Sequence, residues 1–230
     1  MPLVLETRST GELEAILDRV TLLGALASEM VGDAVSLVAR RGEVSAAEQA
    51  IVGRDRAIAT AHATLVRDLQ VQVDWANPVS TDLYFVRSAL RVIDDLKRIS
   101  EYTVCIARIA RCLCEEGLAA SAFDAAYGEP AGDRPRVPLR ALRDIAQSMV
   151  TEAVEVFLTG DFIAADLMVA RQGELELLKA EADRAGSEEI DPWNREALAL
   201  ARLAQVTHYL ERIGAHAARI AERTLCIEIG

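Results

Sequence analysis

Aromatic residues are scarce in this chain: four phenylalanines, four tyrosines and two tryptophans make up 4% of 230 residues. The cores of β-sandwiches and barrels rely on aromatic and β-branched residues, so this scarcity disfavours both folds. Hydrophobic residues nevertheless make up 51% of the chain, and leucine, alanine, valine and isoleucine supply most of them. This balance is typical of packed helices.

Basic residues are too few to balance the acidic ones. The chain has 25 lysines and arginines against 36 aspartates and glutamates, which gives a net charge of -11 and a pI near 4.8. Affinity for nucleic acids comes largely from basic groups that displace counterions from phosphates. The charge therefore argues against DNA or RNA as a direct partner.

Cysteines are also few and unpaired in sequence. Cys105, Cys112, Cys114 and Cys226 contain no Cys-x-x-Cys unit and fall within helical patterns. This arrangement suits neither a disulfide framework nor a zinc knuckle, so we predict reduced cysteines that act as small apolar residues.

Signals for secretion, membrane insertion and catalysis are missing. The first ten residues lack the basic and then apolar organisation of a signal peptide, and the long apolar segments carry charges at short intervals. We therefore expect a cytoplasmic protein without membrane insertion. The chain has no G-x-S-x-G elbow, glycine-rich phosphate loop or H-E-x-x-H helix, so we expect no enzyme.

The chain does carry two copies of one pattern, which points to internal duplication. The stretch Met30–Val35 recurs as Met149–Val154, a shift of 119 positions. Two later blocks recur in the same order: Leu96–Ser100 and Ile106–Arg111 correspond to Leu210–Gly214 and Ala217–Glu222, with Arg98 and Arg212 114 positions apart. A repeat of this length dictates the architecture and locates corresponding sites.

Each copy is expected to form three helices. Apolar residues recur at steps of three, four or seven between Leu83 and Leu113, and similarly in the second copy, which predicts one apolar face on a long helix. Asn77-Pro78 and Asp191-Pro192 precede these helices and suit a cap followed by a proline in the first turn. Gly42 and Gly160 suit the ends of the first helices, where a glycine adopts the left-handed conformation.

A glycine- and proline-rich stretch, Tyr127–Pro135, separates the two copies. We therefore predict an all-α fold of two tandem three-helix bundles, six long helices related by internal duplication and pseudo-twofold symmetry. Residues 1–118 form the first repeat, 119–137 the linker and 138–230 the second repeat.

The second copy contains a motif that resembles the PhoU family. Tyr209–Ala217, followed by Ile220-Ala221-Glu222, is similar to the signature Y-L-E-R-I-G-D-H-A-x-x-I-A-E, and Pro78–Leu83 resembles the P-V-A-x-D-L-R segment. The resemblance implies a non-enzymatic cytoplasmic regulator, often a homodimer. Such a protein acts as an adaptor between the ATPase subunit of the phosphate ABC transporter and a phosphate-sensing histidine kinase, and represses the phosphate-starvation response when phosphate is plentiful.

The resemblance also implies metal ions on acidic clusters formed by an E-x-x-x-D pattern in each half. Carboxylates four apart project from the same side of a helix and can hold a cation together. Here the pattern is Lys97 to Glu101 in the first half and Glu211 to Ala215 in the second, so each half keeps one acid. Because an ammonium one turn from Glu101 can neutralise it, we expect the protein to fold and act without bound transition metal.

A metal-binding helical bundle with carboxylate and histidine ligands is the alternative function. Its candidate ligands for a divalent or iron-type ion are Glu101, Glu211, His208 and Asp94, with Asp95 and His216 nearby. His208 and Glu211 share a helix face. Against this alternative, Asp55 has Gly173 as its repeat counterpart, so the matched acids of a duplicated site are missing.

Candidate partner-binding residues lie on the third helix of each half. They are Arg98, Arg212, Asp82 and Lys97. Arg98 and Arg212 occupy equivalent positions, and a guanidinium suits an acidic partner. The alternative interpretation is that these side chains make ion pairs with acids on neighbouring helices.

Overall fold

The computed structural model describes residues 10–40, 42–75, 80–117, 138–188 and 195–228. Six long helices account for nearly all of them: α1 (Thr10–Val38), α2 (Ser45–Trp75), α3 (Ser80–Glu115), α5 (Leu139–Thr159), α6 (Phe162–Glu188) and α7 (Arg195–Glu228). These described ranges contain no strand. The predicted all-α fold is confirmed.

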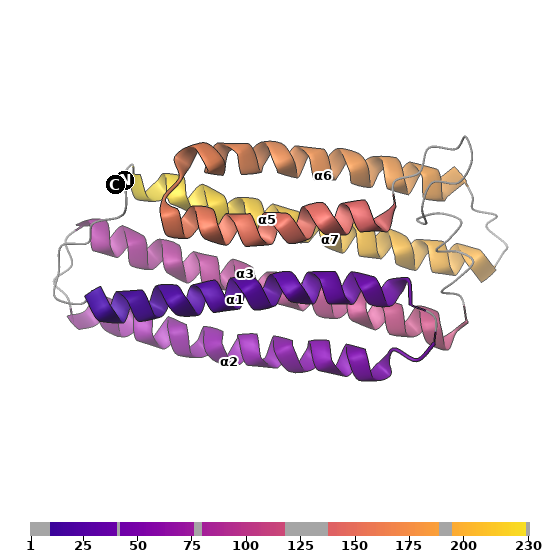
Figure 1. Cartoon of the computed structure of the whole chain (residues 1–230), viewed down its shortest axis with the longest axis horizontal. Helices are drawn as coiled ribbons and strands as arrows, with labels where there is room; N and C mark the ends of the chain where they lie inside the picture. The colour runs from indigo at the N-terminus through magenta and orange to yellow at the C-terminus, as the bar shows by residue number, and fades with distance from the viewer. Residues whose placement is uncertain (1–9, 41, 76–79, 118–137, 189–194, 229–230) are drawn as a thin grey trace.

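Four helices form the centre of the molecule and two lie outside it (Figure 1). The central helices are α1 and α3 from the first half and α5 and α7 from the second. Between the halves α3 packs on α7 and α1 packs on α5, while α2 covers α3 and α1 on one side and α6 covers α7 and α5 on the other. One continuous hydrophobic core joins both halves, with Met30, Ile93, Leu96, Met149 and Leu210 fully buried.

The contact between α1 and α5 has the reciprocity of a twofold axis. Ser28 Oγ lies 2.8 Å from Thr151 Oγ1. Gly32 lies so close to Gln147 that a Cβ on the glycine would be 2.8 Å from Gln147 Oε1. With the shift of 119 positions, Gln147 corresponds to Ser28 and Thr151 to Gly32, so each contact is the counterpart of the other, as in an isologous interface.

The contact between α3 and α7 repeats this relation at a shift of 114 positions. Asp95 Oδ1 lies 2.7 Å from His216 Nδ1, and the rings of Tyr102 and Tyr209 are 5.7 Å apart. Tyr209 is the counterpart of Asp95, and His216 is the counterpart of Tyr102. The two halves therefore pack around a pseudo-twofold axis, as predicted.

One of the sequence alignments between the halves is wrong by three positions. It paired Ile106 with Ala217, a shift of 111, whereas the earlier block of the same helix pair requires 114. Because α3 and α7 are uninterrupted helices, they hold a single register, which the reciprocal contacts fix at 114. The counterpart of Ile106 is Ile220, and the counterpart of Cys105 is Arg219.

A glycine caps the first helix of the second half, but not that of the first half. Gly160 caps α5 in the left-handed conformation, with φ 69°, and its N–H donates to the carbonyl of Val156. Gly42, which follows α1, has φ 103°. The prediction is confirmed for Gly160 and wrong for Gly42, because α1 already ends at Val38 and Gly42 lies in the connection to α2. Asn77-Pro78, Asp191-Pro192 and the predicted linker 119–137 lie outside the described residues.

Helix α1 contains a long apolar stretch. Its stretch Glu14–Val38 has a mean hydropathy of 1.4 over an 18-residue window, so by length and composition alone it could cross a membrane. The sequence analysis did not anticipate this stretch. However, 56% of that window is buried inside the bundle, which is expected of a core helix.

Candidate functional site

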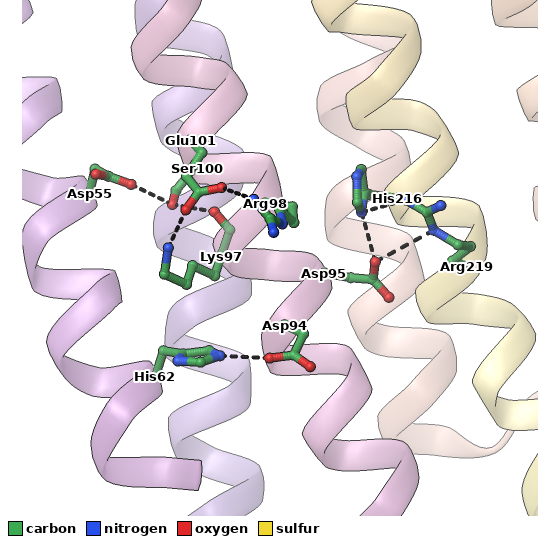
Figure 2. A network of polar contacts seen from close by, with 10 residues as sticks. All are labelled: Asp55, His62, Asp94, Asp95, Lys97, Arg98, Ser100, Glu101, His216 and Arg219. Carbon is green, nitrogen blue, oxygen red and sulfur yellow. Dashed lines mark hydrogen bonds and ion pairs between the residues drawn. The ribbon is translucent and has the colours of Figure 1, made fainter.

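A polar pocket of about 550 Å³ opens where α2, α3 and α7 meet. Its lining consists almost entirely of charged groups: His62 of α2, Arg91, Asp94, Asp95, Lys97, Arg98 and Glu101 of α3, and His216, Arg219 and Arg223 of α7. Figure 2 shows most of these side chains between the helices. Since α3 belongs to the first half and α7 to the second, the pocket lies between the halves.

Helical periodicity explains why these side chains share one face. On α3 the lining positions Arg91, Asp94 or Asp95, Arg98 and Glu101 follow at steps of three or four, which places them on one side of the helix. The positions between them, such as Val92 and Leu96, are fully buried in the core. The same helix therefore supplies both core and pocket.

Two cations from its own helix hold Glu101. Lys97 Nζ donates to Oε1, and Arg98 Nη1 donates to Oε2 at 2.8 Å. Partial burial raises the pKa of the Glu101 carboxyl, but the hydrogen bonds and positive charges of Lys97 and Arg98 outweigh this effect, so its pKa is lowered from the ordinary value. Glu101 is therefore an ionised, fully engaged carboxylate.

A triad of Asp95, His216 and Arg219 spans α3 and α7, and its first two members are nearly buried. The side chains of Asp95 and His216 are only 12% and 8% exposed, and His216 Nδ1 lies 2.7 Å from Asp95 Oδ1. Arg219 Nη2 lies 2.6 Å from the same nitrogen of His216. One ring nitrogen cannot both donate to Asp95 and accept from Arg219, so Arg219 retains a donor without an acceptor when His216 donates to Asp95.

Two further contacts tie α2 to α3 beside the pocket. His62 Nε2 lies 2.8 Å from Asp94 Oδ1. Ser100 Oγ donates to Asp55 Oδ1 at 2.7 Å. Together they fix the wall that α2 contributes (Figure 2).

The structure gathers only some of the residues that the sequence singled out. Asp94, Lys97, Arg98 and Glu101 line the pocket, together with Asp95 and His216. His208 and Glu211 lie elsewhere on α7, 3.4 Å apart, and Arg212 is also outside the lining. Asp82 belongs to the first turn of α3, and its side chain lies outside the described residues.

Four lining residues were missed by the sequence analysis. These are His62, Arg91, Arg219 and Arg223. The spacing of His216, Arg219 and Arg223 at three and four positions within and beyond the family motif is a signal that could have found the α7 wall. No sequence signal places His62 of α2 opposite them.

The described residues do not fit the acidic metal clusters implied by the resemblance. Among them no group of three His, Cys, Asp or Glu side chains lies close enough to share a metal ion. The neighbours of Glu101 are cations rather than further carboxylates. We therefore assign no role to a metal at these positions.

Two three-helix repeats around a pseudo-twofold axis, with a charged pocket between them, define a tandem helical-bundle protein. The family model of the PhoU domain matches this chain twice, over residues 20–110 and 139–224. The chain therefore belongs to the PhoU family, and both the resemblance and the duplication are confirmed.

Curated relatives carry the same description along nearly the whole chain. The phosphate-specific transport system accessory protein PhoU homolog of Pseudomonas putida is 26% identical over 225 residues, which cover 96% of this chain and 80% of that protein. The protein of the same description from Borreliella burgdorferi is 24% identical and covers 99% of this chain and 97% of its own length.

Solved structures share the fold. PhoU from Pseudomonas aeruginosa superimposes with a TM-score of 0.82 at 24% identity, over 97% of this chain and all of that one. The phosphate transport system regulatory protein PhoU from Streptococcus pneumoniae gives a TM-score of 0.74 at 18% identity, over 94% of this chain and 95% of that one. The six-helix arrangement is thus that of known PhoU proteins.

Proposed function

We propose that this protein is a non-enzymatic accessory regulator of phosphate transport. The observation that carries the proposal is the double match to the PhoU domain, which accounts for both halves of the chain. The relatives that align along nearly its full length are described as accessory proteins of phosphate-specific transport. The chain also has no recognised catalytic sequence motif.

In its finer form, the proposal is an adaptor between the ATPase subunit of the phosphate ABC transporter and a phosphate-sensing histidine kinase, acting negatively when phosphate is plentiful. Arg98 suits such a role because its side chain is 65% exposed although it pairs with Glu101. Arg212 is its counterpart in the second half; it is half-buried and makes no ion pair with a described residue. Exposed guanidinium groups recognise acidic surfaces of partner proteins.

Affinity capture from the native cells tests this proposal. The tagged protein is recovered from cultures grown with high and low phosphate, and the captured proteins are identified by mass spectrometry. We expect the transporter ATPase or the kinase to be captured in a phosphate-dependent manner, and Arg98→Ala or Arg212→Ala to reduce capture. Arg108→Ala is the matched control, because Arg108 is exposed on α3 outside the pocket.

Capture of neither protein under either condition would overturn the adaptor function. Equal loss of capture with Arg98→Ala and Arg108→Ala would show that Arg98 does not contribute to the contact.

The proposal includes a cytoplasmic homodimer, as the family resemblance implies. Light scattering at micromolar concentration tests the dimer, and a monomer mass would exclude it.

A further inference from the structure

The pocket between the halves carries a local excess of positive charge on an acidic protein. Five of its lining side chains are Lys or Arg and three are Asp or Glu, although the chain as a whole has a net charge of -11. Lys97 and Arg98 share Glu101, and Arg219 pairs with Asp95. Arg91 and Arg223 make no ion pair with any described residue, so their charges are not balanced within the pocket.

Hydrogen-bond donors are also left over there. The Nε atoms of Arg219 and Arg223 are buried. Arg223 Nε has no hydrogen-bond acceptor, and Arg219 Nε makes only an ion-pair contact of 3.5 Å with Asp95 Oδ1. Arg219 Nη2 competes with Asp95 for a single nitrogen of His216. Buried donors in native proteins are normally satisfied, so the unpaired Nε of Arg223 and the incompletely paired guanidinium of Arg219 beside a pocket indicate a ligand that accepts hydrogen bonds.

Comparison of the two halves shows that this charge is not part of the shared bundle. In the register of 114, four of the five cations have a neutral or acidic counterpart: Arg91 and Gln205, Lys97 and Glu211, Arg219 and Cys105, Arg223 and Ile109. Both halves nevertheless form the same three-helix unit. Folding therefore does not require these cations. Of the two surfaces that the pseudo-twofold axis relates, only one carries them.

We propose that this pocket is a binding site for a small phosphate-type oxyanion, either a single phosphate or linked phosphates. Guanidinium forks match the geometry of phosphate oxygens and bind them through paired, charge-assisted hydrogen bonds. A volume of about 550 Å³ is within the range of small-molecule sites, about 300 to 1,000 Å³. The ligand would contact both halves, because Arg91 lies on α3 and Arg223 on α7.

The proposal favours a small anion over an acidic segment of a partner protein. The cationic side chains converge from α3 and α7 into one concavity, and the Nε atoms of Arg219 and Arg223 are buried. A protein segment would need an extended groove to run along. The proposal rests on the charges of the pocket alone and does not depend on the regulatory function proposed above.

Histidine NMR provides a readout inside the pocket. The chain has three histidines, and His62 and His216 line the pocket whereas His208 does not. The protein is titrated at constant ionic strength with inorganic phosphate, pyrophosphate or tripolyphosphate, with sulfate as the oxyanion control. We expect saturable shifts of the His62 and His216 ring signals with a phosphate ligand, weaker effects of sulfate and no shift of His208.

In each of two variants, a pocket arginine is replaced by the residue at the equivalent position of the other half. Arg223→Ile and Arg91→Gln should each weaken phosphate binding at least about tenfold, whereas Arg108→Gln, which removes an exposed charge from α3 outside the pocket, should change it less than about twofold. Circular dichroism confirms that each variant is folded. The phosphate ligand that saturates the shifts at the lowest concentration identifies the source of the anion.

Three outcomes would overturn the proposal. One is the lack of saturation with all three phosphate ligands, which would leave the cations available to an acidic partner segment. Another is an equal shift of His208, which would indicate general charge screening. The third is an equal loss of affinity in Arg108→Gln and Arg223→Ile.

Discussion

Ser100 of α3 is fully buried, and its hydroxyl donates a hydrogen bond of 2.7 Å to Asp55 of α2. Both members of this pair are glycine in the second half, where Gly214 corresponds to Ser100 and Gly173 to Asp55. Gly214 there lies against Leu175, and a Cβ would be 2.4 Å from Leu175 Cδ2. The two halves thus join their second and third helices by different means.

Ser100→Ala should destabilise the protein by about 1 to 2 kcal/mol. The substitution removes a donor to a carboxylate, and such hydrogen bonds contribute about 1.5 to 3 kcal/mol when both groups are well buried. Asp55 is only half-buried, which reduces the effect. Urea unfolding measures the change, with the exposed Ser36→Ala as a control expected within about 0.5 kcal/mol. Additive effects of Ser100→Ala and Asp55→Ala in a double-mutant cycle would contradict the coupling.

The helices were predictable from the sequence because periodicity and punctuation agree. The apolar positions of α3 and the glycine at position 160 determine local structure, and both signals are local. The correspondence between equivalent residues of α3 and α7 was not predictable along the whole length of the helices. The unit Ile-Ala-Arg occurs twice in succession in Ile106–Arg111, so a shift of three positions still aligns similar residues. Only contacts between the helices resolve the ambiguity.

The candidate site was half predictable for a related reason. Lys97 and Glu101 stand in a recognisable motif on a single helix, so their proximity follows from a spacing of four. His62 and Arg223 come from helices that approach α3 from different sides. Which faces of α2 and α7 meet that helix depends on packing angles, which a single sequence does not specify.

Gly24→Ala should destabilise the protein by about 1 to 3 kcal/mol, the usual range for overpacking. A Cβ at Gly24 would lie 2.7 Å from Val154 Cγ2 of α5. Val154 is buried and β-branched, so it has little freedom to turn away. The α1–α5 contact between the halves would have to open. Thermal and urea unfolding measure the loss.

Gly53→Ala provides the control of opposite sign. Gly53 lies within α2, and nothing approaches within 4 Å of its position for a Cβ. Alanine should therefore stabilise the protein by about 0.5 to 1 kcal/mol through helix propensity. Equal changes in stability for the two variants would show that α1 and α5 do not require a glycine at position 24.

Protein purified without chelator should contain no stoichiometric transition metal. The carboxylate oxygens of Glu101 are both bound by cations, and Ala215 offers no ligand one turn after Glu211. Elemental analysis by mass spectrometry measures the content. Iron, zinc or manganese near one equivalent, released by Glu211→Ala, would refute this expectation and favour the metal-binding bundle.

Lys97→Met should raise the pKa of Glu101. Partial burial raises this pKa, but Lys97 and Arg98 together lower it further, so removing one of them shifts it upward. In the unfolded chain the pKa of a glutamate is about 4.3. Because the pKa of Glu101 is lower in the folded protein, the cluster stabilises the fold at pH values above the unfolded pKa. This stabilisation is lost as the pH falls through the folded pKa. The cost of Lys97→Met should therefore be present at neutral pH and disappear in acid.

Carbon NMR of the Glu101 carboxyl group follows the pKa directly, and urea unfolding at several pH values follows the stability. Lys179→Met is the matched control, because Lys179 makes an equivalent ion pair with Asp183 on α6, at 2.7 Å. It should leave the titration of Glu101 unchanged. If Glu101 titrates at the same pH in Lys97→Met as in the native protein, then Arg98 alone holds the carboxylate, and Lys97 remains available to whatever anion or acidic partner enters the pocket.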